Sequence, residues 1–276
     1  MMAWKAIIAG CLLLAGCGAR SAGKVGPART VLPAPVQAPS KPGTANPVHQ
    51  SESLLVAPAI VIGFVGGFVR HTDSIHSPVQ MAARLRDSYS SAVYVEVFEN
   101  RRREDAHRKI LEVLSQVGGG RLADDAKRQA RVIIYGMSWG GSETVALARE
   151  LKNDKIPVLL TVQVDSVGKV GQNDGLIPSN VAEAANFYQT DGLLHGQVQI
   201  RAEDRTRTRI VGNFHYEYKT KSPSCAEYPW YDRFFTKYHT RIECDPEVWN
   251  HVEKLIRAKL PPAEDKSKTG GAKSEN

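Results

Sequence analysis

The chain has 276 residues, of which 42% are hydrophobic and 24% are charged, and its formal net charge at pH 7 is +7. The basic residues are scattered or grouped on expected exposed helical faces, and they form no stripe interleaved with aromatic residues. This pattern argues against a nucleic-acid-binding protein.

The N-terminus has the features of a targeting segment rather than of a fold. Lys5 precedes an apolar run over residues 6–16 that is too short to span a bilayer as a permanent anchor. The run ends in Leu14-Ala15-Gly16-Cys17, which resembles the lipobox of bacterial lipoproteins. The resemblance implies a signal peptide over residues 1–16, cleavage before Cys17 and lipidation of Cys17. An ordinary secretory signal is the alternative.

The residue after Cys17 bears on the final location. Gly18 is not the aspartate that retains many bacterial lipoproteins at the inner membrane. The resemblance therefore implies a bacterial envelope protein anchored in the membrane by lipid, on the periplasmic face of the outer membrane. Several acyl chains would hold it there firmly, since each buried methylene contributes about 0.8 kcal/mol.

The two ends of the mature chain differ in composition from the middle. Residues 17–52 are rich in Pro, Ala, Gly, Ser and Lys and lack apolar periodicity, which predicts a disordered tether after the lipidated cysteine. Pro261-Pro262 ends the last predicted helix, and we expect residues 262–276 to be a disordered tail. The folded domain is therefore expected over residues 53–261, a length that suits one α/β domain.

Strands and helices alternate in the first part of this domain. Apolar runs of β-branched type predict strands, and apolar residues at spacings of three and four predict helices. The predicted strands are 59–62, 92–98, 131–135 and 156–164, and the helices between them begin at Ser77, Asp105 and Ser142. This alternation predicts an α/β fold, with a mostly parallel sheet and helices on both faces.

The pattern changes after Asp165. Residues 167–186 contain Gly, Asn and Pro and are predicted to form a loop. Residues 198–202 and 208–211 look like short strands joined by a polar turn, which predicts a β-hairpin in the C-terminal half. A last amphipathic helix is predicted from Pro246, with Asp245 at the N-cap position.

The most informative motif is Gly136-Met137-Ser138-Trp139-Gly140-Gly141. It lies between the predicted strand 131–135 and the predicted helix that begins at Ser142. A strand, a Gly-x-Ser-x-Gly turn and a helix resemble the nucleophile elbow of α/β-hydrolases, in which the serine hydroxyl is exposed at the end of the sheet. The alternative is a helix N-cap serine that follows a core strand.

A nucleophilic serine needs a histidine base and a carboxylate that orients it. Asp165 directly follows the strand after the elbow, and the carboxyl ends of parallel strands lie at one edge of the sheet. We therefore expect Asp165 to be the acid. Asp174 and Asp191, in the segments that follow, are the alternatives.

The expected base is His239, which precedes the final helix and is predicted to lie on a loop. His195 and His215 are its competitors. His71 and His76 flank Asp73, but no third ligand stands at a useful spacing, so no metal site is expected.

An oxyanion hole needs two backbone N–H donors directed at the position where negative charge develops. The amide of Trp139, next to Ser138, is one candidate. The other is expected from the glycine-rich run Gly63-Phe64-Val65-Gly66-Gly67, with Phe64 as the first choice and Val65 as the second.

Two cysteines remain after the signal peptide and the lipidation site are set aside. Cys225 and Cys244 form an even pair in an expected oxidising compartment, which predicts one disulfide. Two free buried thiols are the alternative.

Ser138, Asp165 and His239 follow one another in the order found in α/β-hydrolases, and residues 56–260 resemble a thioesterase- or lipase-like member of that superfamily. The resemblance implies a serine hydrolase that cleaves an ester or thioester through an acyl-enzyme, without cofactor or metal. The alternative is a non-catalytic envelope lipoprotein that uses the scaffold for binding. The oligomeric state stays open.

Overall fold

The computed structural model describes residues 58–89, 92–117, 120–220 and 222–263. The predicted signal peptide, Cys17 and the tether lie outside the described residues, as does the tail beyond residue 263. No helix in the described ranges combines the length and apolar character that a bilayer-spanning segment requires.

Six strands form one sheet in which every neighbouring pair is parallel. Their order across the sheet is β2-β1-β3-β4-β6-β8. The strands are β1 (Ala59–Val65), β2 (Val93–Glu99), β3 (Arg131–Met137), β4 (Val158–Val164), β6 (Val181–Tyr188) and β8 (Arg209–His215). The short strands β5 (Leu176–Ile177) and β7 (Arg201–Ala202) pair in parallel by themselves.

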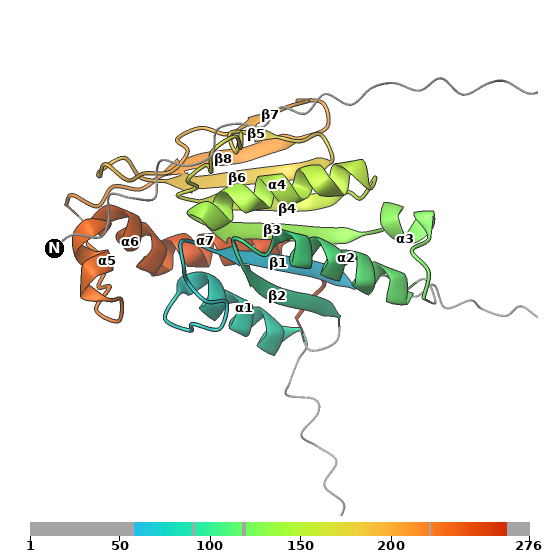
Figure 1. The fold of residues 1–276 in the computed structure, drawn as a ribbon, viewed down its shortest axis with the longest axis horizontal. Helices are drawn as coiled ribbons and strands as arrows, with labels where there is room; N and C mark the ends of the chain where they lie inside the picture. Colours follow the sequence, from blue (N-terminus) through green and yellow to red (C-terminus); the bar gives the residue numbers. More distant parts are fainter. Residues whose placement is uncertain (1–57, 90–91, 118–119, 221, 264–276) are drawn as a thin grey trace, which may run out of the picture. The chain divides into compact units, whose positions relative to one another are not determined.

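Helices cover both faces of the sheet, which confirms the predicted fold class. On one face, α1 (Ser77–Ser88) and α7 (Pro246–Arg257) pack on inward residues such as Val61 and Ile133. On the other, α2 (Arg103–Val117) and α4 (Trp139–Asn153) pack on residues such as Ile60 and Ile134. Figure 1 shows α4 and α7 on opposite sides of the sheet. Successive residues of each strand therefore point to opposite faces of the sheet and pack into two separate apolar cores.

Three short helices complete the described elements: α3 (Asp124–Arg128), α5 (Trp230–Phe235) and α6 (Lys237–Cys244). Of these, α5 and α6 lie together at one end of the sheet in Figure 1, near the start of α4. The predicted helix from Pro246 is present as α7, and the Asp245 side chain accepts a hydrogen bond from the Glu247 amide at 2.9 Å. This N-cap determines where α7 begins, directly after the end of α6.

The strand order reverses direction at β1. From β1 the chain passes to β2 on one side, and it then returns to β3 on the other side. In open α/β sheets, ligands bind in the crevice beyond the carboxyl ends of the strands at such a reversal. Phe64 of β1 is paired with Gly136 of β3, and Met137 with Val164 of β4, so the three strands end at nearly the same level.

The predicted β-hairpin is wrong. β8 pairs in parallel with β6 at the edge of the sheet, while β7 pairs with β5. The Arg201 and Glu203 amides donate to the Gly175 and Ile177 carbonyls at 2.8 Å, so this segment is held by an earlier part of the chain rather than by β8.

The loop predicted over residues 167–186 is also wrong in its second half, because Val181–Tyr188 forms β6. Ala184 and Ala185 are fully buried between neighbouring strands. Alanine has little intrinsic preference for strands, and burial between two strands overrides that preference here.

Candidate functional site

Ser138 lies in a sharp turn between β3 and α4, as the motif predicts. Its backbone has φ 58° and ψ −125°, a combination that non-glycine residues rarely adopt and that typically costs about 1–3 kcal/mol. The helix approaches β1 so closely that a Cβ on Gly140 would lie 2.7 Å from the Phe64 carbonyl carbon. The glycine therefore allows the strained turn to form, and the turn leaves the Ser138 side chain partly exposed.

The Asp165 carboxylate is completely buried at the end of β4. It accepts hydrogen bonds from four donors: the Gly196 amide at 2.7 Å, the Gln189 amide at 3.4 Å, the Gln189 Nε2 at 2.8 Å and a ring nitrogen of His239 at 2.7 Å. No sequence pattern indicated the roles of Gln189 and Gly196, which lie in the segment that follows β6. These partners fix the orientation of the carboxylate without exposing it to water.

His239, on α6, is the side chain that the Asp165 carboxylate orients. Its Nδ1 lies 2.7 Å from Asp165 Oδ2, and the residue is 8% exposed. The other three partners of the Asp165 carboxylate are N–H donors, and a carboxylate only accepts hydrogen bonds. Nδ1 of His239 therefore donates to Asp165 and carries the ring proton. In the neutral ring, Nε2 then carries the free lone pair. The predicted loop position of His239 is wrong, since the residue lies in the first turn of a helix.

Main-chain hydrogen bonds hold Ser138 beside Asp165. The Ser138 amide donates to the Val164 carbonyl at 3.0 Å, and the Ser138 carbonyl accepts from the Val167 amide at 3.1 Å. Among the hydrogen bonds of the described residues, none joins the Ser138 hydroxyl to His239. Catalytic hydrogen bonds are often long in ligand-free sites and shorten when substrate binds.

The alternative acids and bases have partners elsewhere. Asp174 accepts from the Ser166 hydroxyl at 2.5 Å, and Asp191 accepts from the Tyr218 amide at 2.5 Å. His215 stacks on the Tyr188 ring, and His195 Nδ1 lies 3.1 Å from the carbonyl of the next residue, Gly196. Of the candidate acids and bases, the structure therefore brings together Asp165 and His239.

The two choices for the second oxyanion donor, Phe64 and Val65, are the last residues of β1. Phe64 is paired in register with Phe98 of β2 and Gly136 of β3, and Val65 with Glu99 of β2. Their role as donors stays a prediction. The first residue past the strand is Gly66, where an added Cβ would lie 3.5 Å from the Ser138 hydroxyl oxygen. The turn at Gly66-Gly67 is therefore a further candidate for the second donor. Trp139 begins α4, where amides have no partner within the helix.

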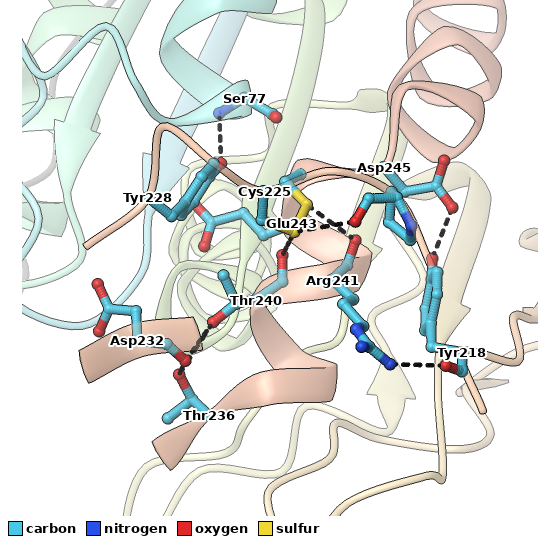
Figure 2. Close-up of a disulfide and its surroundings, with 12 residues drawn as sticks. Ser77, Tyr218, Cys225, Tyr228, Asp232, Thr236, Thr240, Arg241, Glu243 and Asp245 are labelled. Atoms are coloured by element: carbon cyan, nitrogen blue, oxygen red, sulfur yellow. Dashed lines mark hydrogen bonds between the residues drawn. A yellow bond between two sulfur atoms is a disulfide. The ribbon is translucent and has the colours of Figure 1, made fainter. Parts of the chain in front are cut away.

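A disulfide joins Cys225 to Cys244, as predicted, with the Cα atoms 5.7 Å apart. Cys244 is the last residue of α6, the helix that carries His239. Figure 2 shows the same region secured by the Arg241 guanidinium, which donates to the Tyr218 carbonyl at 2.7 Å, and by the Tyr218 hydroxyl, which donates to Asp245 at 3.0 Å. The disulfide and these bonds hold α6 in position.

The histidines around Asp73 have carboxylate partners on distant elements. His71 Nδ1 lies 2.8 Å from Glu99, and His76 Nδ1 lies 2.7 Å from Glu243 on α6. Burial lowers the pKa of His76, but the hydrogen bond and the charge of Glu243 outweigh it, so the pKa lies above its ordinary value of 6.5. No cluster of three or more His, Cys, Asp or Glu suited to a metal ion occurs within the described ranges.

A surface cleft of about 620 Å³ lies away from these residues. It follows β8 and α7 and is lined by residues 213–218 together with Asp245, Glu247 and His251. None of Ser138, Asp165 and His239 belongs to its lining. We therefore locate the candidate site by its chemical groups and by the strand ends rather than by the size of a cavity.

The sequence matches no protein-family model and no curated protein. Similar solved structures include an arylesterase, with 16% identity over 40% of this chain and 37% of that chain and a TM-score of 0.29. A dienelactone hydrolase from Anabaena variabilis shares 12% identity over 73% of this chain and 85% of its own, with a TM-score of 0.36. Human thioesterase 2 shares 10% identity over 70% and 98%, with a TM-score of 0.33. These TM-scores are low, and the case for function rests on the residues of the site.

Proposed function

We propose that this protein is a serine hydrolase of the α/β-hydrolase type that cleaves a carboxylic ester or thioester through an acyl-enzyme. The observation that carries the proposal is the buried Asp165–His239 pair beside the strained turn at Ser138. A buried carboxylate that orients a histidine, next to a serine in such a turn, suits nucleophilic catalysis and has no evident use in a purely structural turn.

The proposed acylation step uses the free lone pair of His239. Nε2 takes the proton of the Ser138 hydroxyl while the hydroxyl oxygen attacks the acyl carbonyl carbon. The imidazole becomes positively charged, and the Asp165 carboxylate on its other side stabilises this charge. The proton then passes from His239 to the departing alcohol or thiol, and the acyl group remains on Ser138.

The proposed deacylation step repeats this transfer with water. His239 removes a proton from a water molecule, the hydroxide attacks the acyl-enzyme, and Ser138 recovers its proton as the acid leaves. In both steps the carbonyl oxygen becomes negative. The Trp139 amide at the start of α4 and the backbone of the Gly66-Gly67 turn are the proposed donors to that oxygen.

We also propose that the enzyme works at the bacterial envelope, held by lipid on Cys17 on the periplasmic face of the outer membrane. The support is the Leu14-Ala15-Gly16-Cys17 sequence and the disulfide between Cys225 and Cys244, which suits an oxidising compartment. Metabolic labelling with a clickable fatty acid should mark the chain and fail to mark the Cys17→Ser variant.

The activity is tested with soluble substrates. We expect the chain to hydrolyse short nitrophenyl esters or acyl thioesters, with the activity lost in Ser138→Ala and retained in Ser74→Ala, a control at an exposed serine. Hydrolysis that is unchanged in Ser138→Ala would overturn the assignment of the nucleophile. No hydrolysis of any ester or thioester by the folded chain would instead favour the reading as a non-catalytic binding protein.

A further inference from the structure

The surface of α5 is unusual for a soluble domain. None of its six residues is buried. Its four aromatic side chains are 68%, 50%, 73% and 65% exposed, and they belong to Trp230, Tyr231, Phe234 and Phe235. We call these four residues the α5 aromatic surface. Clustered exposed apolar side chains of this kind mark an interaction site.

The aromatic rings contact one another instead of the protein core. The Trp230 and Tyr231 rings meet edge to face at 6.1 Å, and the Phe234 and Phe235 rings do the same at 5.1 Å. None of the four residues belongs to either core cluster. The four side chains therefore contribute little to the stability of the fold. Their exposure indicates a binding partner outside the domain.

Two exposed cations and two acidic residues flank this surface. Arg233 and Lys237 are exposed, and neither forms an ion pair with a carboxylate in the described part of the chain. The acidic residue of α5, Asp232, is half-buried, and burial together with nearby Glu243 raises its pKa. Glu227, on the preceding turn, is exposed. Cations beside Trp, Tyr and Phe form the combination that binds the headgroup region of an anionic bilayer.

We propose that the α5 aromatic surface docks on an anionic phospholipid bilayer. Trp and Tyr favour the boundary between headgroups and acyl chains, and Phe234 and Phe235 would insert beside them while Arg233 and Lys237 contact phosphate groups. This docking does not depend on the proposed hydrolysis, and it is separate from the lipid expected on Cys17.

The length of chain before the domain supports this occupant. Residues 18–58 lie between Cys17, the proposed lipid anchor, and β1. If Cys17 carries lipid, this length of chain places the domain within reach of the bilayer that holds the lipid, since a Pro-rich segment spans about 3.1 Å per residue when extended. A second copy of the chain fits less well, because stable interfaces use about 20–30 residues on each side and this surface has four aromatic residues.

The position of α5 gives the docking a consequence for the candidate site. The Asp232 carbonyl accepts hydrogen bonds from the Thr236 and Thr240 hydroxyls at 2.8 Å and 2.9 Å, which couples α5 to the helix that carries His239 (Figure 2). Docking through α5 would therefore hold the His239 end of the domain close to the lipid.

The first test follows Trp230 in the full chain bound to phosphatidylethanolamine–phosphatidylglycerol vesicles. Brominated acyl chains quench only those tryptophans that enter the bilayer. The difference in tryptophan fluorescence between the parent and Trp230→Phe reports on Trp230. We expect brominated lipid to quench this difference. If that difference is unaffected by brominated lipid, Trp230 stays in water and the proposal is wrong. The comparison isolates α5 even if another segment also binds the vesicles.

The second test measures partition onto the same vesicles by sedimentation, with Cys17→Ser in every chain so that no added lipid contributes. Phe234→Ser with Phe235→Ser should weaken binding at least about tenfold, since each ring loses its burial in lipid. The control, Val170→Ser with Leu193→Ser, removes two apolar residues that are 106% and 107% exposed elsewhere, and should bind like the parent. Equal binding by all three chains would contradict the proposal.

Two further outcomes separate the possible explanations. Ser138→Ala should bind vesicles like the parent, so a loss of hydrolysis with intact docking would count only against the proposed function. If sedimentation velocity instead shows a dimer that the Phe234→Ser, Phe235→Ser variant abolishes, and vesicles capture neither form, the surface binds a second copy and the lipid proposal is overturned.

Discussion

The Nδ1 atom of His239 lies 2.7 Å from the Oδ2 atom of Asp165, although 74 positions separate the two residues in the chain. The carboxylate is fully buried, and its remaining hydrogen bonds come from Gln189 and Gly196. Such an arrangement fixes both the orientation of the imidazole and the nitrogen that carries its proton.

The first prediction concerns this pair. Asp165→Asn keeps the shape of the side chain but allows its amide to donate, so the imidazole can adopt the other tautomer and present N–H instead of a lone pair. We expect kcat/KM for ester hydrolysis to fall on the order of 10³–10⁴-fold, measured by steady-state kinetics. Asp174→Asn is the control, because Asp174 binds Ser166 and does not contact His239. A similar small loss in both variants would show that Asp165 is not the orienting acid.

The second prediction concerns the close approach of α4 to β1. Gly140→Ala places a methyl group against the Phe64 backbone, which cannot move away without disturbing the sheet. We expect the free energy of unfolding to fall by roughly 1–3 kcal/mol and the reactivity of Ser138 to be lost, as urea titration and ester hydrolysis would measure. In the control Gly168→Ala, the nearest atom is the end of the Asp174 side chain at 3.2 Å, so both quantities should change little. Full activity in Gly140→Ala would mean that the turn is not held as described.

The fold could be predicted from the sequence where the chain follows local rules. Residues 131–135, the Gly-x-Ser-x-Gly turn and the helix after it have the apolar pattern and the small residues that a strand–turn–helix unit needs, and the structure contains that unit. Asp245 and Pro246 likewise predicted the start of α7, because N-cap and first-turn preferences are local.

The other features of the fold and of the candidate site depend on contacts between distant segments, which local sequence patterns do not indicate. The alanine-rich β6 becomes a strand only because β4 and β8 bury it from both sides. Gln189 and Gly196 acquire their roles because the chain that follows β6 passes Asp165. In each case a tertiary contact between distant segments decided the outcome, and local pattern carried no signal of it.

The third prediction concerns the disulfide. Cys225→Ser with Cys244→Ser removes the link between the end of α6 and a residue 19 positions earlier. In the chain-entropy model this link contributes about 3 kcal/mol, so we expect chemical denaturation to show a loss of that order. Because α6 carries His239, ester hydrolysis should fall as well. Dithiothreitol should produce both effects in the parent chain and neither in the double variant. Two free thiols in a non-reduced digest of the parent would contradict the assignment.

The fourth prediction concerns pH and stability through His76. The Glu243 carboxylate raises the pKa of His76 in the folded chain above 6.5 despite the opposing effect of burial, so the folded state binds this proton more tightly than the unfolded state does. The stabilisation is therefore fully present below the unfolded pKa and is lost as pH rises through the folded one.

His76→Gln cannot bind this proton. The difference in unfolding free energy between the parent and His76→Gln should thus shrink as pH rises from the range below 6.5 to the range above the raised pKa, as urea titrations at a series of pH values would measure. The comparison variant is Glu243→Gln, which keeps the imidazole of His76 and removes the carboxylate that raises its pKa. A difference that grows with pH would contradict the assigned direction of the shift.

The most direct measurement of the central claim is site-mapped labelling of the folded chain with a fluorophosphonate, a reagent that reacts with activated serine hydroxyls. Peptide mass spectrometry is predicted to find the adduct on Ser138, with labelling absent in Ser138→Ala and greatly slowed in His239→Gln. An adduct that forms at the same rate without His239, or a folded chain that takes up no reagent at Ser138, would contradict the account.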